Sequence, residues 1–341
     1  MITVGIVGCG YWGQNLVRNY HQLNIADLKY VCDIDQKRIN YVREFYPAVK
    51  TTENFQDLLD DPAVDAIVVA LPAGMHFAFT KQALEAGKHT FVEKPLATTL
   101  KDATALVDLA RKNNLTLMVG HTFEYNAAVQ EVKKYIDRGD LGKIYYLYAQ
   151  RLNLGRVRDD INAMWNLAPH DISIILYWLG QEPVSLQAWG ITCLQKGLED
   201  VVFLVMHFPD GVSAHIHTSW LDPNKVRKMT VVGSRKMIVY DDTSSEARIQ
   251  IFDKGIDKKN IDVNLGEYDS FAKFQLIQRA GDLLIPRIHF TEPLRVECSH
   301  FIECIEKGET PRTDGESGLR VVKILEAADA SLKNSGKVIE L

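Results

Sequence analysis

Three closely spaced glycines and one later aspartate are the first residues whose types and spacing suggest a binding chemistry. Gly8, Gly10 and Gly13 follow the apolar run 2–7, and a helical pattern begins directly after them. In a strand–turn–helix unit such glycines permit the tight turn, let the backbone approach a pyrophosphate, and let the helix pack on the strand. The phosphates then lie at the helix N-terminus. Asp33 falls where a carboxylate binds the ribose hydroxyls, so the sequence predicts a dinucleotide site.

A lysine lies at the end of a later strand pattern, in the order Glu93-Lys94-Pro95. Proline restricts the residue before it, so we expect the Lys94 ammonium group at the carboxyl end of the strand, where such sheets bind ligands. There it can donate a hydrogen bond to a substrate hydroxyl and stabilise negative charge that develops on the oxygen. The alternative is a solvent-exposed lysine paired with Glu93. Position alone does not decide between the two.

A histidine in the apolar segment 165–180 is the candidate base. If Pro169 takes the first position of a helix, which suits its missing N–H group, the core-facing stripe runs from Ile172 to Leu179. His170 then points to the opposite face, which is also largely apolar, so the helix is expected to be covered all round. His170 is either a core histidine with satisfied hydrogen bonds or a base that faces a pocket.

Two further groupings have weaker spacing. His215 and His217 share one face of a strand, but no nearby cysteine, aspartate or glutamate has ligand spacing, so we expect no metal site. Asp159 and Asp160 resemble a catalytic acid pair, but a solvated loop accounts for them better.

Composition restricts the classes of protein to which the chain can belong. Its 341 residues suffice for two domains, and its apolar (46%) and charged (24%) contents are ordinary for a globular protein. A net charge of −5 without a run of lysine or arginine argues against nucleic-acid or membrane partners. No apolar stretch is long enough to span a membrane, and we expect no signal peptide. The five cysteines lack close pairing, which indicates reduced thiols and a cytoplasmic protein.

The elements that position these residues fall into two groups. Residues 1–121 alternate between strand and helix patterns, which predicts an α/β domain of parallel strands with crossover helices. The candidate binding residues of this part fall at the carboxyl ends of its strands. Short strands dominate 184–263, the stretch 253–279 is irregular, and two helices close the chain. We therefore expect a doubly wound Rossmann domain over 1–121 and an α+β domain with a mostly antiparallel sheet over 122–341.

Taken together, the glycine pattern, the sequence Glu93-Lys94-Pro95 and the segment 165–171 resemble the Gfo/Idh/MocA family of glucose–fructose oxidoreductase and inositol dehydrogenase. The C-terminal stretch 308–319 is similar to that family as well. The resemblance covers essentially the whole chain. It implies hydride transfer between NAD(P) and a sugar or cyclitol carbon. It also implies a second domain for substrate binding and oligomerisation, with a large open sheet that often forms the subunit interface, so we expect a homodimer or homotetramer.

The resemblance implies roles for particular residues. The family's catalytic lysine and histidine correspond to Lys94 and His170. Many members have an aspartate four residues before the histidine, whereas this chain has Asn166, which can orient a hydroxyl but cannot stabilise an imidazolium as a carboxylate does. Branches that act on nucleotide sugars are similar in having asparagine there.

The expected binding residues include these three. The cofactor, expected to be NAD, is bound by Gly8, Gly10, Tyr11, Trp12, Gly13, Asp33, Leu71, Pro72, His76, Glu93 and Lys94. The substrate is bound by Lys94, Tyr125, Arg156, Arg158, Asn166 and His170. Asp33 would repel a 2′-phosphate, which favours NAD over NADP, although Arg38 lies close enough in sequence to bind such a phosphate.

The predicted function is NAD-dependent oxidation of a ring hydroxyl, at C3, of a nucleotide sugar such as UDP-N-acetylglucosamine or its uronate. Arg156 and Arg158 precede His170, and an arginine fork suits a desolvated diphosphate. If both arginines instead pair with Asp159 and Asp160, the substrate is a free sugar or inositol. An alternative of another class is a non-catalytic NAD-bound sensor or scaffold, which the presence of both candidate catalytic residues disfavours.

Overall fold

The computed structural model describes residues 1–155, 157–256 and 278–341. They form two compact units, one comprising Met1–Asn126 with Thr291–Glu326 and the other Ala127–Phe290 with Ala327–Leu341. This division differs from the expected one into 1–121 and 122–341, because a segment near the C-terminus belongs to the first unit. No helix in the described ranges is long and apolar enough to cross a membrane.

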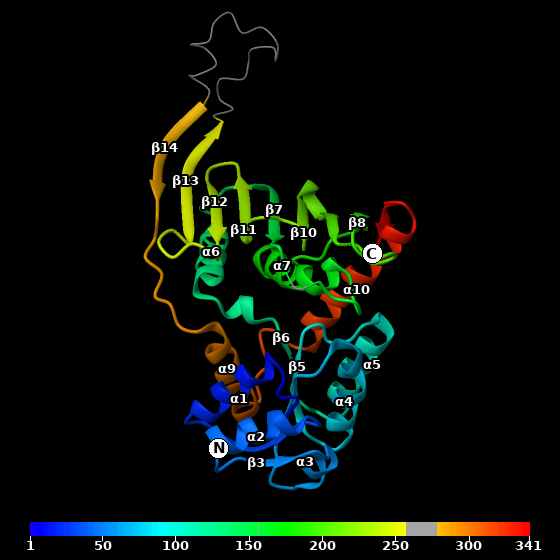
Figure 1. Cartoon of the computed structure of the whole chain (residues 1–341). Coiled ribbons are helices and arrows are strands. Elements are labelled where there is room, and N and C mark those ends of the chain that lie inside the picture. Colours follow the sequence, from blue (N-terminus) through cyan, green and yellow to red (C-terminus); the bar gives the residue numbers. More distant parts are fainter. Residues whose placement is uncertain (156, 257–277) are drawn as a thin grey trace, which may run out of the picture. The chain divides into compact units, whose positions relative to one another are not determined.

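The first unit is built on a six-stranded sheet in the order β3-β2-β1-β4-β5-β6, and every neighbouring pair is parallel (Figure 1). Its strands are β1 (Ile2–Val7), β2 (Ala26–Cys32), β3 (Lys50–Thr52), β4 (Ala66–Val69), β5 (His89–Glu93) and β6 (Leu117–Gly120). The order reverses at β1, with β2 on one side and β4 on the other. Such a switch point is where open parallel sheets bind ligands. The expected doubly wound Rossmann fold is confirmed.

The helices of this unit begin at recognisable sequence signals. They are α1 (Gly13–Gln22), α2 (Gln36–Phe45), α3 (Gln56–Asp60), α4 (Ala73–Glu85), α5 (Leu100–Lys112) and the short η1 (Thr122–Tyr125). Asp35 caps α2 by accepting a hydrogen bond from the Lys37 N–H group, and Thr99 caps α5 by accepting one from Asp102. β4 is buried at every position, as expected for a strand covered on both faces.

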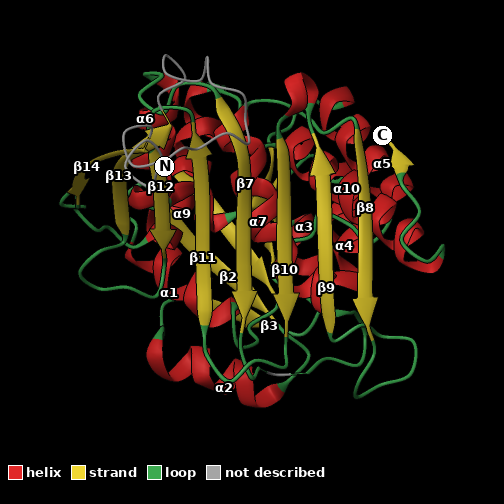
Figure 2. Cartoon of the chain, turned by 90° about the horizontal axis from the view of Figure 1, so that it is seen from above, coloured by secondary structure: helices red, strands yellow, loops and turns green. Residues whose placement is uncertain are grey.

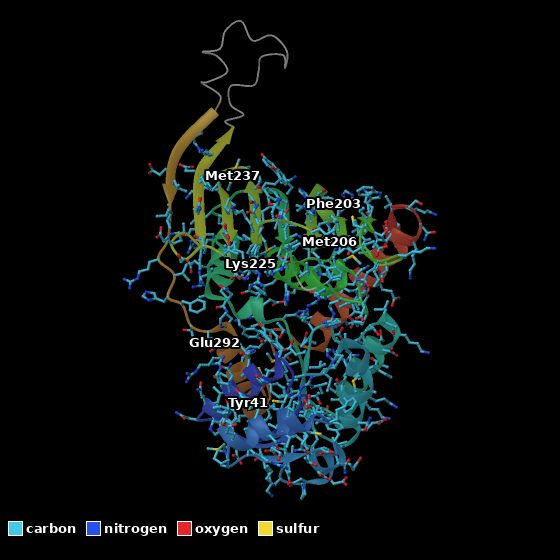
Figure 3. All side chains as sticks on the ribbon, viewed as in Figure 1. Tyr41, Phe203, Met206, Lys225, Met237 and Glu292 are labelled. Atoms are coloured by element: carbon cyan, nitrogen blue, oxygen red, sulfur yellow. The ribbon has the colours of Figure 1, made fainter. Side chains whose placement is uncertain are left out.

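The segment Thr291–Glu326 completes the first unit. It contains α9 (Pro293–Lys307) and the first part of α10 (Gly315–Lys333), two helices that the sequence predicts without indicating their place. Glu292, labelled at the start of α9 in Figure 3, accepts hydrogen bonds from the Arg18 guanidinium at 2.5 and 3.0 Å. Since Arg18 belongs to α1, this pair attaches α9 to the helix that follows the glycine-rich loop.

The second unit contains a nine-stranded sheet in the order β14-β13-β12-β11-β7-β10-β9-β8-β15 (Figure 2). Its strands are β7 (Ile144–Leu152), β8 (Ser185–Ile191), β9 (Val201–His207), β10 (Ser213–Ser219), β11 (Val226–Gly233), β12 (Met237–Asp241), β13 (Ile249–Ile256), β14 (Gln278–Leu284) and β15 (Ile339–Glu340). Among these described strands only β7 and β10 pair in parallel. The expected mostly antiparallel sheet is confirmed. β13 and β14 occupy the two ends of the stretch 253–279, whose middle lies outside the described residues.

The two faces of this sheet have different surroundings. On one face, α7 (Ala163–Leu179) packs against β7, β9 and β10, and α6 (Ala127–Asp137) packs against β12. Figure 3 labels Met206 and Phe203 on β9, three positions apart and therefore on opposite faces. Met206 is buried, whereas Phe203 is exposed. In Figure 2 no described helix crosses the face of the sheet that is turned to the viewer.

Helix α7 begins six residues before Pro169, so the expectation that this proline takes the first helical position is wrong. Asn162 caps the helix by accepting a hydrogen bond from the Trp165 N–H group at 3.0 Å. This asparagine is the stronger start signal, and the proline lies inside the helix. Asn166 and His170 are therefore both helical, and their spacing of four residues places them on one face.

Candidate active site

The glycine-rich loop between β1 and α1 is tightly packed at two glycines and open at the third. Gly8 has a φ of +94°, and a Cβ there would lie 2.4 Å from the Ala70 carbonyl oxygen. A Cβ on Gly13 would lie 2.2 Å from the Gly8 oxygen. At Gly10 the nearest atom, an Arg38 guanidinium nitrogen, is 3.8 Å away. The loop thus has the tight turn, the close packing and the open backbone that a pyrophosphate requires, and it fits a dinucleotide.

Asp33 follows β2, and its carboxylate is buried against the same loop. It accepts hydrogen bonds from the N–H groups of Cys9 at 2.7 Å and Asp35 at 2.9 Å. Arg38 approaches this carboxylate at 3.2 Å while 44% of the arginine side chain stays exposed. A carboxylate has about four acceptor positions, so a ribose hydroxyl that binds Asp33 would replace a long contact from the exposed Arg38 at 3.2 or 3.4 Å. Burial, and then the charge of Asp33, raise the pKa of the Cys9 thiol to about 11, which keeps it protonated.

His76 lies on α4 and joins the ends of β4 and β5. Its Nδ1 is 2.6 Å from the Pro95 carbonyl oxygen, and its Nε2 is 2.8 Å from the Leu71 carbonyl oxygen. The ring is buried, and this burial lowers its pKa. Because both nitrogens face backbone carbonyls, His76 braces the ends of these two strands, and its contact with the cofactor stays a prediction. Leu71 is half-buried and Pro72 is exposed, so both remain accessible at this strand end.

Glu93 ends β5, and Lys94 follows it directly. The Glu93 carboxyl group is buried and accepts a hydrogen bond from the Trp12 indole N–H at 2.6 Å. Burial raises the pKa of Glu93 to about 7, although the Trp12 bond and the Lys94 charge act in the opposite direction. The Lys94 charge also lowers the pKa values of His76 and His121. Lys94 therefore lies at the carboxyl end of β5, near enough to His76 and His121 for its charge to act on both.

His121 follows β6 and is buried next to this group. Burial, and then the Lys94 charge, lower its pKa to about 3, so the imidazole is neutral. Neither ring nitrogen has a hydrogen-bond partner among the described residues. The sequence identified His121 only by its position at a strand end, and the structure adds that it neighbours Lys94.

The placement of Tyr125 does not support the expected contact with a substrate. Its side chain is buried in the first unit, and its hydroxyl lies 3.2 Å from that of Thr313. The ring also packs against His300 and lies beneath the Arg312 guanidinium group. These partners come from the returning C-terminal segment, which the sequence did not place here. Tyr125 therefore packs in the core of the first unit, and its contact with a substrate stays a prediction.

In the second unit, Asn166 and His170 are both half-buried on one face of α7. Next to them, Asp171 forms a buried ion pair with Arg151 of β7. Arg151 Nε donates to Oδ2 at 2.8 Å, and Nη2 donates to Oδ1 at 2.9 Å. A two-pronged bond of this kind fixes direction as well as distance. It therefore fixes the turn of α7 that carries His170.

Arg151 is a residue that sequence reasoning missed. Its position in the strand could have indicated its burial. Alternate residues of a strand face the same side, so Arg151 lies on the same buried face as Leu147 and Ala149. A buried arginine needs a charged partner. Asp171, which directly follows the candidate base His170, is that charged partner.

The arginine-bearing loop is described only in part, because Arg156 lies outside the described residues. Arg158 donates from Nε and Nη2 to the two carboxylate oxygens of Asp160 at 2.7 and 2.6 Å. This agrees with the alternative in which the loop arginines pair with the loop aspartates. Both side chains are more than one-third exposed, and an exposed ion pair contributes about 0–1 kcal/mol. Arg158 can therefore exchange Asp160 for a phosphate at small cost.

His215 and His217 belong to an aromatic face of the sheet. His215 stacks on Tyr148 with 5.5 Å between ring centroids, and His217 stacks on Phe203 with 4.3 Å. Within the described ranges, no group of three or more histidine, cysteine, aspartate or glutamate side chains could hold a metal ion. Ring stacking accounts for both histidines.

Comparison with known proteins identifies the family. A family model described as an oxidoreductase family with an NAD-binding Rossmann fold matches residues 2–121, and a model of the GFO/IDH/MocA C-terminal domain matches residues 129–239. The chain belongs to the Gfo/Idh/MocA oxidoreductase family. This confirms the resemblance carried by the sequence motifs and the assignment of NAD as cofactor.

Similar members of the Gfo/Idh/MocA family differ in substrate. The UDP-N-acetylglucosamine 3-dehydrogenase of Acidithiobacillus ferrooxidans is 28% identical over 236 residues, covering 67% of this chain and 71% of that protein. The myo-inositol 2-dehydrogenase of Thermotoga maritima is 22% identical over 347 residues, covering 99% and 98%. A solved structure of UDP-N-acetylglucosamine 3-dehydrogenase from A. ferrooxidans matches with a TM-score of 0.82 at 23% identity, over 98% of both chains. That likeness shows the shared fold.

Proposed function

We propose that this protein is an NAD-dependent dehydrogenase that oxidises a ring hydroxyl of a sugar, specifically C3 of a nucleotide sugar such as UDP-N-acetylglucosamine or its uronate. The observation that carries the reaction is the position of Lys94. Lys94 directly follows β5 at its carboxyl end, on the side of the switch point at β1 opposite to Asp33. A dinucleotide whose adenosine ribose is held at Asp33 would extend its reactive ring toward that side.

In the proposed reaction, three residues of this chain have different roles. Bound NAD supplies the hydride acceptor. His170 takes the proton of the reacting hydroxyl as general base. Lys94 donates a hydrogen bond to the same oxygen and stabilises the negative charge that develops there as the C–O bond becomes a carbonyl. Asn166, one helical turn before His170, orients the hydroxyl.

Three features support a nucleotide sugar. Asn166 is the residue that resembles the nucleotide-sugar branches, and a similar protein is named UDP-N-acetylglucosamine 3-dehydrogenase. Arg158 is half-exposed in the loop before α7 and can bind a phosphate. The second candidate is a free inositol or sugar, favoured by the Arg158–Asp160 pair and by the similarity to an inositol dehydrogenase. A sensor or scaffold is disfavoured because it needs neither Lys94 nor His170.

Neutralising the loop arginines separates these substrates. In the double variant Arg156→Gln/Arg158→Gln, we expect KM for UDP-N-acetylglucosamine to rise about tenfold or more, since charge-assisted bonds to phosphate are lost, while KM for NAD is unchanged. Arg138→Gln is the matched control, because Arg138 forms a similar exposed pair with Asp140 in the same unit. An unchanged KM in the double variant, or faster oxidation of free inositol or glucose, would leave the free-sugar dehydrogenase as the function.

We further propose that copies of the chain pair through the open face of the nine-stranded sheet, giving a homodimer or homotetramer. This face displays Trp189, Phe203 and Tyr146, all at least 39% exposed. Trp189 stacks on Phe203, so the apolar surface is continuous rather than scattered.

All five cysteines are free, which supports a reducing compartment and hence the cytoplasm.

A further inference from the structure

The hydrogen bond between Trp12 and Glu93 joins two parts of the first unit that have separate tasks. Trp12 belongs to the glycine-rich loop, and Glu93 immediately precedes Lys94. The indole N–H of Trp12 donates to Glu93 Oε1 at 2.6 Å, and the backbone N–H of Lys94 donates to Oε2 at 3.3 Å. One carboxyl group therefore contacts both the loop and the lysine residue.

The Glu93 carboxyl group occupies a position that the neighbouring strand leaves free for it. Gly120 of β6 is its partner in the sheet register. A Cβ on Gly120 would come within 3.0–3.1 Å of all three atoms of the Glu93 carboxyl group. The Glu93 carboxyl group is buried while Trp12 is 40% exposed, so the bond is partly shielded from solvent. A bond to a buried carboxylate is shorter and stronger than one between neutral groups.

The residues directly before and after Lys94 are both held by hydrogen bonds. Before it, Glu93 is tied to Trp12, and after it, the Pro95 carbonyl oxygen is 2.6 Å from His76. The charge of Lys94 favours the ionised form of Glu93, whereas Glu297 of α9 contributes a second buried carboxyl group nearby. The indole bond is thus one of the few favourable contacts available to this carboxylate.

We propose that Glu93 is a positioning residue that fastens the glycine-rich loop to the segment carrying Lys94, so that a loop shaped to receive the dinucleotide also fixes the lysine. This inference rests on the proposed role of Lys94 in the reaction. It predicts a specific coupling: releasing the loop impairs NAD binding and turnover to a similar degree, whereas removing the ammonium group lowers turnover far more than NAD binding.

Trp12→Phe tests the coupling, because phenylalanine keeps an aromatic ring and removes the N–H group. We expect the dissociation constant of NAD, measured by calorimetric titration without substrate, to rise about tenfold, and kcat to fall about tenfold. Tyr30→Phe is the matched control, since it removes another side-chain bond to a carboxylate in the same unit, from Tyr30 to Asp61 at 3.0 Å. The control should leave both quantities unchanged.

Two substitutions at Glu93 distinguish a positioning role from a general loss of stability. Glu93→Gln keeps an acceptor for the indole and should stay within about threefold of the wild type in NAD binding, whereas Glu93→Leu should match Trp12→Phe. The double variant Trp12→Phe/Glu93→Leu should be no worse than either single variant, because both remove the same bond.

Two outcomes would overturn the inference: Trp12→Phe within twofold of the wild type in both measurements, or additive effects in the double variant. The NAD titration does not depend on the reaction. It therefore tests whether Glu93 fastens the glycine-rich loop even if the proposed role of Lys94 is wrong. That role fails separately, if Lys94→Ala retains normal turnover.

Discussion

At the residue scale, we propose that Asp33 and Arg38 set the choice of dinucleotide. Asp33 is buried and paired with Arg38, and in the proposed site its carboxylate accepts a hydrogen bond from a free ribose 2′-hydroxyl and repels a 2′-phosphate. We expect kcat/KM to favour NAD over NADP. In Asp33→Ser the negative charge is lost and Arg38 is released to bind a 2′-phosphate, so this preference should fall by about 100-fold. A wild-type preference for NADP would contradict the assignment.

The strand-end positions of the candidate site residues were predictable, because local spacing encodes them. The three glycines, Asp33 and Lys94 follow strand ends, and a parallel sheet gathers such ends at one edge. The surroundings of His76 and Tyr125 were not predictable, because their partners are distant in the sequence. The carbonyl group that occupies one nitrogen of His76 belongs to Pro95, and the hydroxyl that meets Tyr125 belongs to Thr313.

At the scale of elements, the buried fork between Arg151 of β7 and Asp171 of α7 anchors the helix that carries His170. Asp171→Asn removes the charge that balances a buried guanidinium group, so we expect the free energy of unfolding to fall by about 3–5 kcal/mol. Urea denaturation measures the change. The exposed Arg158–Asp160 pair supplies the control, since Asp160→Asn should cost less than about 1 kcal/mol. Equal effects of the two substitutions would show that the fork does not anchor α7.

The sequence predicted most elements but not every assignment. Strands of the first unit were recognisable because continuous apolar runs such as β4 are typical of strands covered on both faces. The apolar stripe of α9 fits either unit equally well, and only tertiary contacts such as Phe301 with Phe91 decide its place. The start of α7 differs from the predicted one because the side chain of Asn162 caps the helix, while Pro169 lies inside it.

At the scale of the whole molecule, we propose that the open sheet face determines assembly. Trp189→Glu/Phe203→Glu places two charges on this exposed aromatic surface, and we expect the mass measured by light scattering to fall to that of one chain. Phe45→Glu is the control, because Phe45 is an exposed aromatic residue of the first unit. A wild-type protein that is already monomeric, or a double variant of unchanged mass, would contradict assembly through this face.

The most direct test of the central claim is the rate of NADH formation by the wild type, Lys94→Ala and His170→Ala, with UDP-N-acetylglucosamine and its uronate compared with free sugars and inositols. The account predicts that the wild type reduces NAD with a nucleotide sugar. Each substitution should lower kcat by roughly two to four orders of magnitude, because an acid–base or electrostatic group is lost, while calorimetric NAD binding stays unchanged. Near-normal turnover by either variant, on a substrate that the wild type oxidises, would contradict the account.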